Sequence, residues 1–236
     1  MSELLIVKNI TREGPGLLQQ VLEEANISFD VVDLDIGEAF PTPTDYKALV
    51  VLGGPDSAND TTDKMGRELD QIKVALNAGI PYLGICLGLQ TLVKVAGGSI
   101  VKAENKEVGF INPDGSQYTV ERTEAGKSDP LLAGLNESLD VFQLHGEAVE
   151  MTDTMTLLAT GKYCQNQIVK VADKAYGIQS HFELTPEMLA VWAANDPDLM
   201  PIGNERLQAD FEAIKEPYTR IGETLLRNFL GVANLL

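Results

Sequence analysis

Cys86 is the side chain in this sequence best placed to act as a nucleophile. It stands between two glycines in the motif Gly84-Ile85-Cys86-Leu87-Gly88. The apolar run 81–85 predicts a strand before it, and the run 87–96 predicts a helix after it. A strand, a tight turn and a helix are the setting of a nucleophile elbow, in which flanking residues must be small. Because a helix N-terminus favours a thiolate, we predict that Cys86 is reactive.

A base for this nucleophile has only two histidine candidates, His145 and His181. His181 follows the apolar run 176–179 and precedes Glu183 by two residues. Functional groups collect at the carboxyl ends of strands in open α/β sheets, so Cys86 and His181 are expected to meet there. The base takes the thiol proton and returns it to a leaving group, and a carboxylate fixes its tautomer. The sequence predicts a triad of Cys86, His181 and Glu183.

Other residues near these motifs have less specific signals. His145 ends another apolar run, which suits either a substrate contact in the same cleft or a structural or exposed histidine. Cys164 lacks flanking glycines, so a structural or cleft-lining thiol is expected there. Gly53-Gly54-Pro55 ends a predicted strand, where backbone amides of Gly54 and Leu87 can form an oxyanion hole. The alternative for the glycine pair is a plain turn.

The elements that must position these residues alternate between strand and helix in the first half of the chain. The predicted strands cover 4–7, 29–34, 48–52 and 81–85, and the predicted helices cover 16–25, 64–77 and 87–96. This alternation predicts a mostly parallel sheet with helices on both faces, a three-layer α/β/α fold.

The second half of the chain has a different pattern. Short alternating runs predict additional antiparallel strands along the sheet edge, at 108–111, 118–122, 141–144, 156–159 and 167–171. A strand at 176–179 leads to His181, and helices are expected at 185–195 and 218–229. With no long linker between the halves, we expect a single domain over residues 1–236.

Charge and composition exclude several classes of function. The chain has 35 acidic and 18 basic residues, a net charge of −17. Such a surface repels phosphate backbones and anionic lipids, so neither nucleic acid nor a membrane is expected as a partner. Two cysteines form no disulfide framework, and the first residues lack the basic region of a signal peptide. We expect a cytoplasmic protein.

Local signatures of cofactors are missing from the sequence. No pair of cysteine or histidine residues has the spacing of a metal site, so no metal is expected. No glycine-rich phosphate-binding motif occurs either, so no cofactor is predicted.

Together these motifs resemble those of the class I (triad) glutamine amidotransferases. The matching segments, in order and spacing, are Gly53-Gly54-Pro55, the elbow motif extended to Gln90, and His181-Phe182-Glu183. The runs 141–145 and 157–160 are similar to the stand-alone branch, which is related to the glutaminase domain of GMP synthase and to γ-glutamyl peptidases. The resemblance implies a flavodoxin-like fold.

The resemblance also implies a reaction and a set of substrate contacts. Cys86 would attack the side-chain amide of glutamine, forming a γ-glutamyl thioester and releasing ammonia. Gly53, Gln90 and His145 would bind the substrate. The usual proline between the histidine and the glutamate is Phe182 here, and the preceding aromatic residue is Ser180, which leaves the substrate fit open. A separate ammonia-accepting synthetase subunit and a homodimer are the candidate protein partners.

Three functions share these motifs. The first is a glutaminase that supplies ammonia to an acceptor enzyme, and the second is a γ-glutamyl peptidase or hydrolase acting on a larger γ-glutamyl compound. The third is a non-catalytic regulatory module. A related family with a cysteine elbow carries its histidine shortly after the cysteine, but no histidine occurs here between Cys86 and His145.

Overall fold

The computed structural model describes residues 2–236 and contains a nine-stranded sheet with strand order β2-β1-β3-β4-β11-β10-β9-β6-β7. The strands that pair in parallel are β2 (Phe29–Asp33), β1 (Leu4–Lys8), β3 (Ala48–Val51), β4 (Tyr82–Ile85) and β11 (Ala175–Ile178). The strands that extend this sheet in antiparallel pairing are β10 (Ile168–Ala172), β9 (Thr156–Gly161), β6 (Thr119–Arg122) and β7 (Ser138–Asp140). A separate antiparallel ribbon pairs β5 (Ser99–Gly109) with β8 (Gln143–Glu150).

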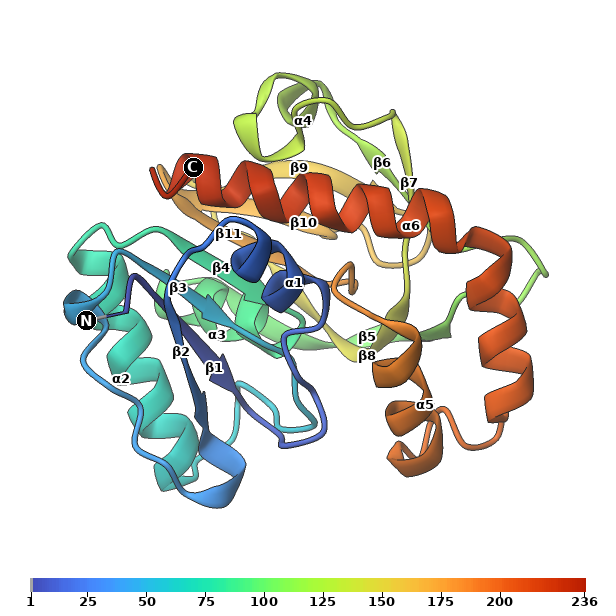
Figure 1. Cartoon of the computed structure of the whole chain (residues 1–236), viewed down its shortest axis with the longest axis horizontal. Helices are drawn as coiled ribbons and strands as arrows, with labels where there is room; N and C mark the ends of the chain where they lie inside the picture. The colour runs from blue at the N-terminus through green and yellow to red at the C-terminus, as the bar shows by residue number, and fades with distance from the viewer. Residues whose placement is uncertain (1) are drawn as a thin grey trace.

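Helices cover both faces of the main sheet (Figure 1). Their bounds are α1 (Leu17–Glu24), α2 (Asp63–Asn77), α3 (Leu87–Val95), α4 (Glu124–Ser128), α5 (Pro186–Asn195) and α6 (Asn204–Val232). Short 3-10 turns occupy Leu34–Ile36, Pro43–Asp45 and Pro130–Leu132. Within residues 2–236, no helix is both long and apolar enough to cross a membrane.

Side-chain alternation along the strands explains the two buried layers. Leu4 and Ile6 of β1 belong to the cluster that also holds Leu18 of α1 and Leu225 of α6. Their neighbours in β1 belong to the opposite cluster, with residues of α2 and α3. Because successive side chains of a strand point to opposite faces, one apolar strand supplies both layers. The three-layer α/β/α fold with antiparallel edge strands agrees with the prediction.

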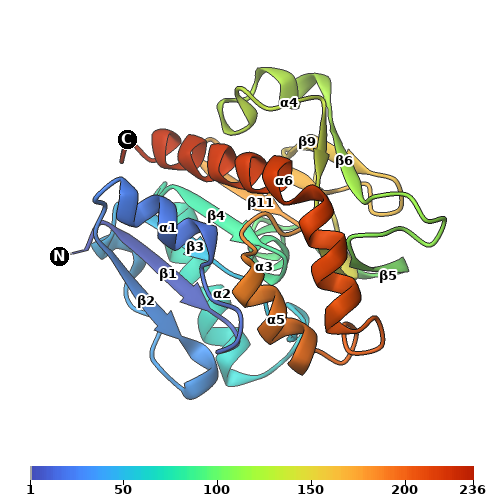
Figure 2. The same ribbon diagram turned by 45° about the vertical axis from the view of Figure 1, so that its right-hand side comes forward.

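The last helix is longer than predicted. The sequence indicated a helix over 218–229, but α6 begins at Asn204. Pro217 lies inside it, and a proline cannot donate the backbone hydrogen bond of that position. The helix continues because Leu207 and Phe211 are buried in a third apolar cluster. Figures 1 and 2 show α6 bent along its length, with its first part beside α5.

The predicted strand 141–144 is wrong in its bounds. Strand β7 ends at Asp140 in the main sheet, and β8 begins at Gln143 in the separate ribbon. Between them, Phe142 forms an isolated bridge to His181, whose N–H donates to the Phe142 carbonyl oxygen at 2.8 Å. The chain therefore crosses from one sheet to the other beside His181, which brings the ribbon next to the predicted site.

Candidate active site

Cys86 occupies a strained turn between β4 and α3. Its backbone angles are φ 52 and ψ −105, which a non-glycine residue adopts only when its surroundings impose them. A Cβ atom on Gly84 would lie 2.2 Å from the Gly88 carbonyl oxygen, and one on Gly88 would lie 2.1 Å from that of Val51. Both flanking positions therefore require glycine. This arrangement directs the thiol into a cavity while the N-terminus of α3 lies behind it.

His181 and Glu183 form a buried pair beside this thiol. Glu183 Oε1 lies 2.6 Å from His181 Nδ1, and its Oε2 accepts the Phe182 N–H at 2.9 Å. Burial alone lowers the pKa of His181, but the Glu183 charge and the hydrogen bond with Glu183 outweigh it and raise that pKa well above its usual value. The pair can therefore hold an imidazolium next to a thiolate.

Packing holds the His181 ring in one orientation. The Trp192 ring lies edge-on to it with centroids 5.1 Å apart, and Phe142 packs at 6.1 Å. The Tyr218 hydroxyl of α6 donates to the His181 carbonyl oxygen at 2.9 Å. These contacts come from three separate segments, so the position of the imidazole depends on the tertiary fold.

Gly53 and Gly54 follow β3 and lie against the elbow. A Cβ atom on Gly53 would lie 3.2 Å from His181 Cε1 and 3.5 Å from Cys86 Cβ. A Cβ atom on Gly54 would lie 2.7 Å from Asn9 Cβ. Leu87 is the first residue of α3, so its amide has no acceptor within the helix. Gly54 lines the cavity, and an oxyanion hole formed by the Gly54 and Leu87 amides stays a prediction.

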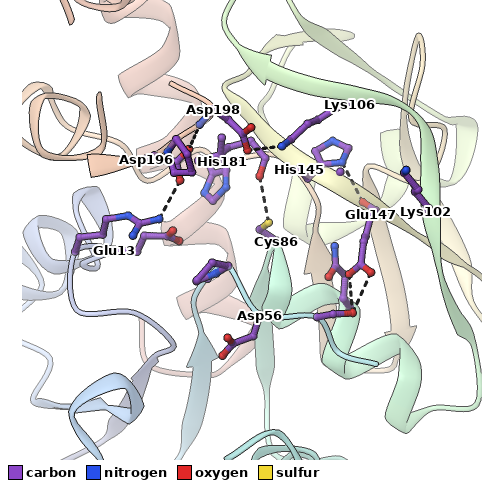
Figure 3. Close-up of a pocket in the computed structure, with 18 residues that line it drawn as sticks. Glu13, Asp56, Cys86, Lys102, Lys106, His145, Glu147, His181, Asp196 and Asp198 are labelled. Carbon is purple, nitrogen blue, oxygen red and sulfur yellow. Dashed lines mark hydrogen bonds and ion pairs between the residues drawn. The ribbon is translucent and has the colours of Figure 1, made fainter. Parts of the chain in front are cut away.

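Most of the predicted site residues line one cavity of about 600 Å³. Figure 3 shows Cys86 in its wall, with Glu13 and His181 on one side and His145 and Glu147 on the other. Several charged side chains also line it: Arg12, Glu13, Asp56, Lys102, Lys106, Glu147, Asp196 and Asp198. A cavity of this size can enclose a small organic ligand.

Gln90 contributes to the cavity and also to a buried amide chain. Its Nε2 donates to Gln179 Oε1 at 3.4 Å, and Gln179 Nε2 donates to Cys86 Sγ at 3.6 Å. Gln179 therefore links Gln90 to the sulfur of Cys86. The sequence motifs assigned no role to Gln179, although its position at the end of the strand before His181 was a usable signal.

Glu13 is a second residue of the site that the motifs did not reveal. It lies in the loop after β1 with 5% of its surface exposed. Burial raises the pKa of Glu13 to about 7, an effect that the nearby charge of His181 opposes. No local pattern marks a loop glutamate for burial, so only the fold reveals it.

His145 lies in the cavity wall, where its ring nitrogens face Glu147 and Glu107 rather than the Cys86–His181 pair. It belongs to a second buried group with Glu107 and Cys164. Burial raises the pKa of Cys164 to about 12, with a smaller contribution from the Glu107 charge. Cys164 is therefore a protonated, buried thiol, as the structural alternative for this residue expected.

Comparison with known proteins relates the chain to one family. The profile of class-I glutamine amidotransferases matches residues 16–190. The glutamine amidotransferase-like protein YfeJ of Salmonella typhimurium is 34% identical over 181 residues, which cover 74% of this chain and 73% of YfeJ. A glutamine-hydrolysing GMP synthase from an Azoarcus species is 25% identical over 230 residues, which cover 93% of this chain but 42% of the synthase. The chain thus spans less than half of that relative.

Solved structures share the fold over nearly the whole chain. A glutamine amidotransferase from Thermotoga maritima superposes with a TM-score of 0.85 and 27% identity, covering 97% of this chain and 98% of the other. A glutamine amidotransferase from Methylobacillus flagellatus also has a TM-score of 0.85, with 23% identity over 98% of this chain and 95% of the other. At that identity the second match supports the fold alone.

Proposed function

Because this chain belongs to the class-I glutamine amidotransferase family, we propose that it hydrolyses the γ-amide of glutamine with Cys86 as nucleophile. The observation that carries the proposal is the strained elbow thiol in a cavity wall beside the buried His181–Glu183 pair. A free cysteine, a paired imidazole and an orienting carboxylate are the groups that acyl transfer through sulfur needs.

The first half of the reaction forms a thioester. His181 takes the proton of Cys86, and the thiolate attacks the amide carbon of glutamine. The Gly54 and Leu87 amides stabilise the resulting oxyanion by donating hydrogen bonds to it. The carbon–nitrogen bond then breaks, and His181 returns the proton to the departing ammonia. The product on the enzyme is a γ-glutamyl thioester of Cys86.

The second half of the reaction restores the thiol. His181 removes a proton from water, and the hydroxide attacks the thioester carbonyl. The carbon–sulfur bond breaks, Cys86 leaves as thiolate and regains its proton from His181, and glutamate is released. Throughout, Glu183 stabilises the imidazolium that forms twice in the cycle.

Released ammonia either passes to an acceptor enzyme or leaves as a product of plain hydrolysis. The GMP synthase relatives are named as glutamine-hydrolysing enzymes, and one of them, from Sulfurisphaera tokodaii, is a subunit rather than a whole synthase. That subunit is 30% identical over 142 residues, which cover 59% of this chain and 69% of the subunit. By analogy, we propose a separate synthetase chain as the ammonia acceptor. A homodimer is a second candidate assembly.

The cavity favours one alternative substrate class. Besides the residues of the triad, Lys102, Lys106 and Asp198 also line it. A γ-glutamyl amide or peptide would place its leaving amine in this charged region. Hydrolysis of such a compound uses the same steps, with the amine leaving in place of ammonia.

Labelling with the glutamine-analogue electrophile 6-diazo-5-oxo-norleucine tests the glutamine proposal. We expect one adduct on Cys86, mapped by mass spectrometry, and protection by excess glutamine. Labelling of Cys164 instead, or no adduct while iodoacetamide still modifies Cys86, contradicts a glutamine pocket. In the second case, turnover of larger γ-glutamyl amides identifies the alternative.

Replacement of the two cysteines separates catalysis from structure. Cys86→Ser should lose nearly all turnover, by a factor of about 10⁴ or more, because a serine hydroxyl is a far weaker nucleophile than a cysteine thiolate. Cys164→Ser is the matched control and should retain activity within a few-fold. Equal activity of Cys86→Ser and wild type would falsify the assignment.

A further inference from the structure

Three buried side chains from separate segments converge outside the triad. Glu107 lies on β5, His145 lies opposite it on β8, and Cys164 lies between β9 and β10. One oxygen, one nitrogen and one sulfur of these residues all lie within 4.8 Å of one another. The residues are 1%, 4% and 6% exposed. Carboxylate, imidazole and thiolate are the three ligand types that zinc binds in proteins.

The hydrogen bond of His145 Nδ1 leaves the lone pair of its other ring nitrogen, Nε2, facing Glu107. Its Nδ1 lies 3.0 Å from the Glu147 carbonyl oxygen (Figure 3). A carbonyl oxygen only accepts, so Nδ1 carries the proton and Nε2 carries the lone pair in the neutral ring. Histidines that bind metals commonly donate their other ring N–H to a carbonyl or carboxylate in this way.

The lone pair of His145 has no suitable partner among the described residues. Nε2 lies 3.1 Å from Glu107 Oε2, close enough for an ion pair, yet the direction does not satisfy hydrogen-bond geometry. Gln167 donates to the same carboxylate oxygen at 3.4 Å, which is a long bond. Two buried electron-rich atoms that face each other are stabilised by a cation placed between them.

We propose that Glu107, His145 and Cys164 bind a divalent cation of the zinc type. At zinc bond lengths of about 2.0–2.3 Å, tetrahedral ligand atoms lie about 3.5 Å apart, so atoms of the cluster that now lie up to 4.8 Å apart need to approach by up to about 1.3 Å. The cation displaces the proton of Cys164, because a coordinated thiol is deprotonated. The three residues leave the fourth tetrahedral position for a water molecule.

Such a site would connect two parts of the fold. Glu107 and His145 belong to the β5–β8 ribbon, whereas Cys164 belongs to a connection of the main sheet. The carbonyl oxygen of Leu144, next to His145, lies 3.8 Å from Cys86 Sγ. A cation at the cluster therefore fixes the ribbon against the sheet and stabilises the cavity wall near the nucleophile. The proposal does not depend on the glutaminase reaction.

Cobalt binding tests the site, because the chain has only two cysteines. Co²⁺ bound to a thiolate has a sulfur-to-metal charge-transfer absorption. We expect this absorption in wild type and in Cys86→Ser, and its loss in Cys164→Ser. Absorption that survives in Cys164→Ser but vanishes in Cys86→Ser would assign the metal to the triad and overturn the proposal. Absence of the absorption from both wild type and Cys86→Ser would also overturn it.

Two further measurements do not use Cys164→Ser, a substitution of a buried residue. X-ray absorption of zinc bound to Cys86→Ser should show one sulfur at about 2.3 Å with nitrogen and oxygen neighbours. Glu107→Gln keeps the shape of the side chain but removes its charge, so its zinc dissociation constant should rise at least about tenfold in equilibrium dialysis. Zinc without a sulfur neighbour, or equal affinity in Glu107→Gln and wild type, excludes the cluster as the site.

Discussion

At the scale of single residues, the site contains a carboxyl group that is absent from the predicted triad, that of Glu13. A Cβ atom built on Gly53 would meet Glu13 Oε2 at 2.6 Å and His181 Cε1 at 3.2 Å, so Glu13 and the triad converge on the same glycine. The pKa of Glu13 is raised to about 7 by burial. The charge near His181 therefore changes around neutral pH. A carboxylate there stabilises the imidazolium, and a neutral acid does not.

We predict that Glu13 contributes an ionisation near pH 7 to the activity profile. Above that pH its carboxylate stabilises the His181 imidazolium, which forms when His181 takes the proton of Cys86, so kcat/KM should rise through neutrality. Glu13→Gln should lack this rise over about pH 6–8 and be a few-fold less active at the upper end of that range. The control is Asp56→Asn, another change of a cavity carboxylate, which should keep the wild-type profile. An unchanged profile in Glu13→Gln contradicts this role.

At the scale of elements, α6 packs against the segment that carries His181 and Glu183. The Tyr218 hydroxyl donates to the His181 carbonyl oxygen at 2.9 Å and accepts the Leu184 N–H at 3.3 Å. One turn later, Gly222 packs directly on the backbone of Phe182: a Cβ atom there would lie 2.2 Å from its carbonyl oxygen. The last helix thus positions the segment that carries both His181 and Glu183.

Gly222→Ala tests this support. The added methyl group must displace either α6 or the Phe182 carbonyl, so we expect a loss of about 1–3 kcal/mol in the free energy of unfolding. The displacement should also lower kcat, since it moves the triad segment. Urea denaturation and a turnover assay measure both effects.

Gly231→Ala is the matched control in the same helix. Nothing lies within 4 Å of a Cβ atom at that position. Alanine forms helix more readily than glycine, so this variant should be as stable as wild type or up to about 1 kcal/mol more stable. If Gly222→Ala behaved like Gly231→Ala, contact between α6 and the triad segment would have no energetic importance.

At the scale of the whole molecule, buried carboxyl groups make stability depend on pH. Glu68 of α2 is fully buried and accepts a hydrogen bond from Asn9 at 3.1 Å. Burial raises the pKa of Glu68 to about 7, more than the Asn9 bond and the Lys64 charge lower it. Between pH 4.5 and 7 the folded state keeps a proton that the unfolded state has released. Stability therefore falls as the pH rises through this range and levels off above it.

We predict that Glu68→Gln removes this fall in stability with rising pH. The amide is neutral at every pH and can still accept from Asn9, so the variant should exceed wild type by about 2–3 kcal/mol near pH 8. Near pH 5 the two proteins should differ little. Denaturant unfolding at both pH values measures the difference, and exposed Asp70→Asn on the same helix serves as the control. If Glu68→Gln stabilised the protein equally at both pH values, protonation of Glu68 would not be the cause of the stabilisation.

Much of the fold could be predicted because its first half is encoded locally. The strands β1, β3 and β4 are short runs of mainly apolar residues. Helix α2 begins at Asp63 after the capping side chain of Thr62, which accepts the Met65 N–H at 3.2 Å. These signals require no knowledge of distant residues. The single-domain boundary stays a prediction. The roles of the site residues also stay predictions, and activity and labelling test them.

The sequence by itself determined the elbow, the alternation of strands and helices in the first half, and the candidate pair His181–Glu183, because each depends on neighbours within a few residues. Tertiary structure decided the start of α6 at Asn204, the crossing of the chain into the ribbon after Asp140, and the burial of Glu13. It alone brought Glu107 and Cys164 to His145. These features arise from packing between segments far apart in the chain, which local periodicity does not encode.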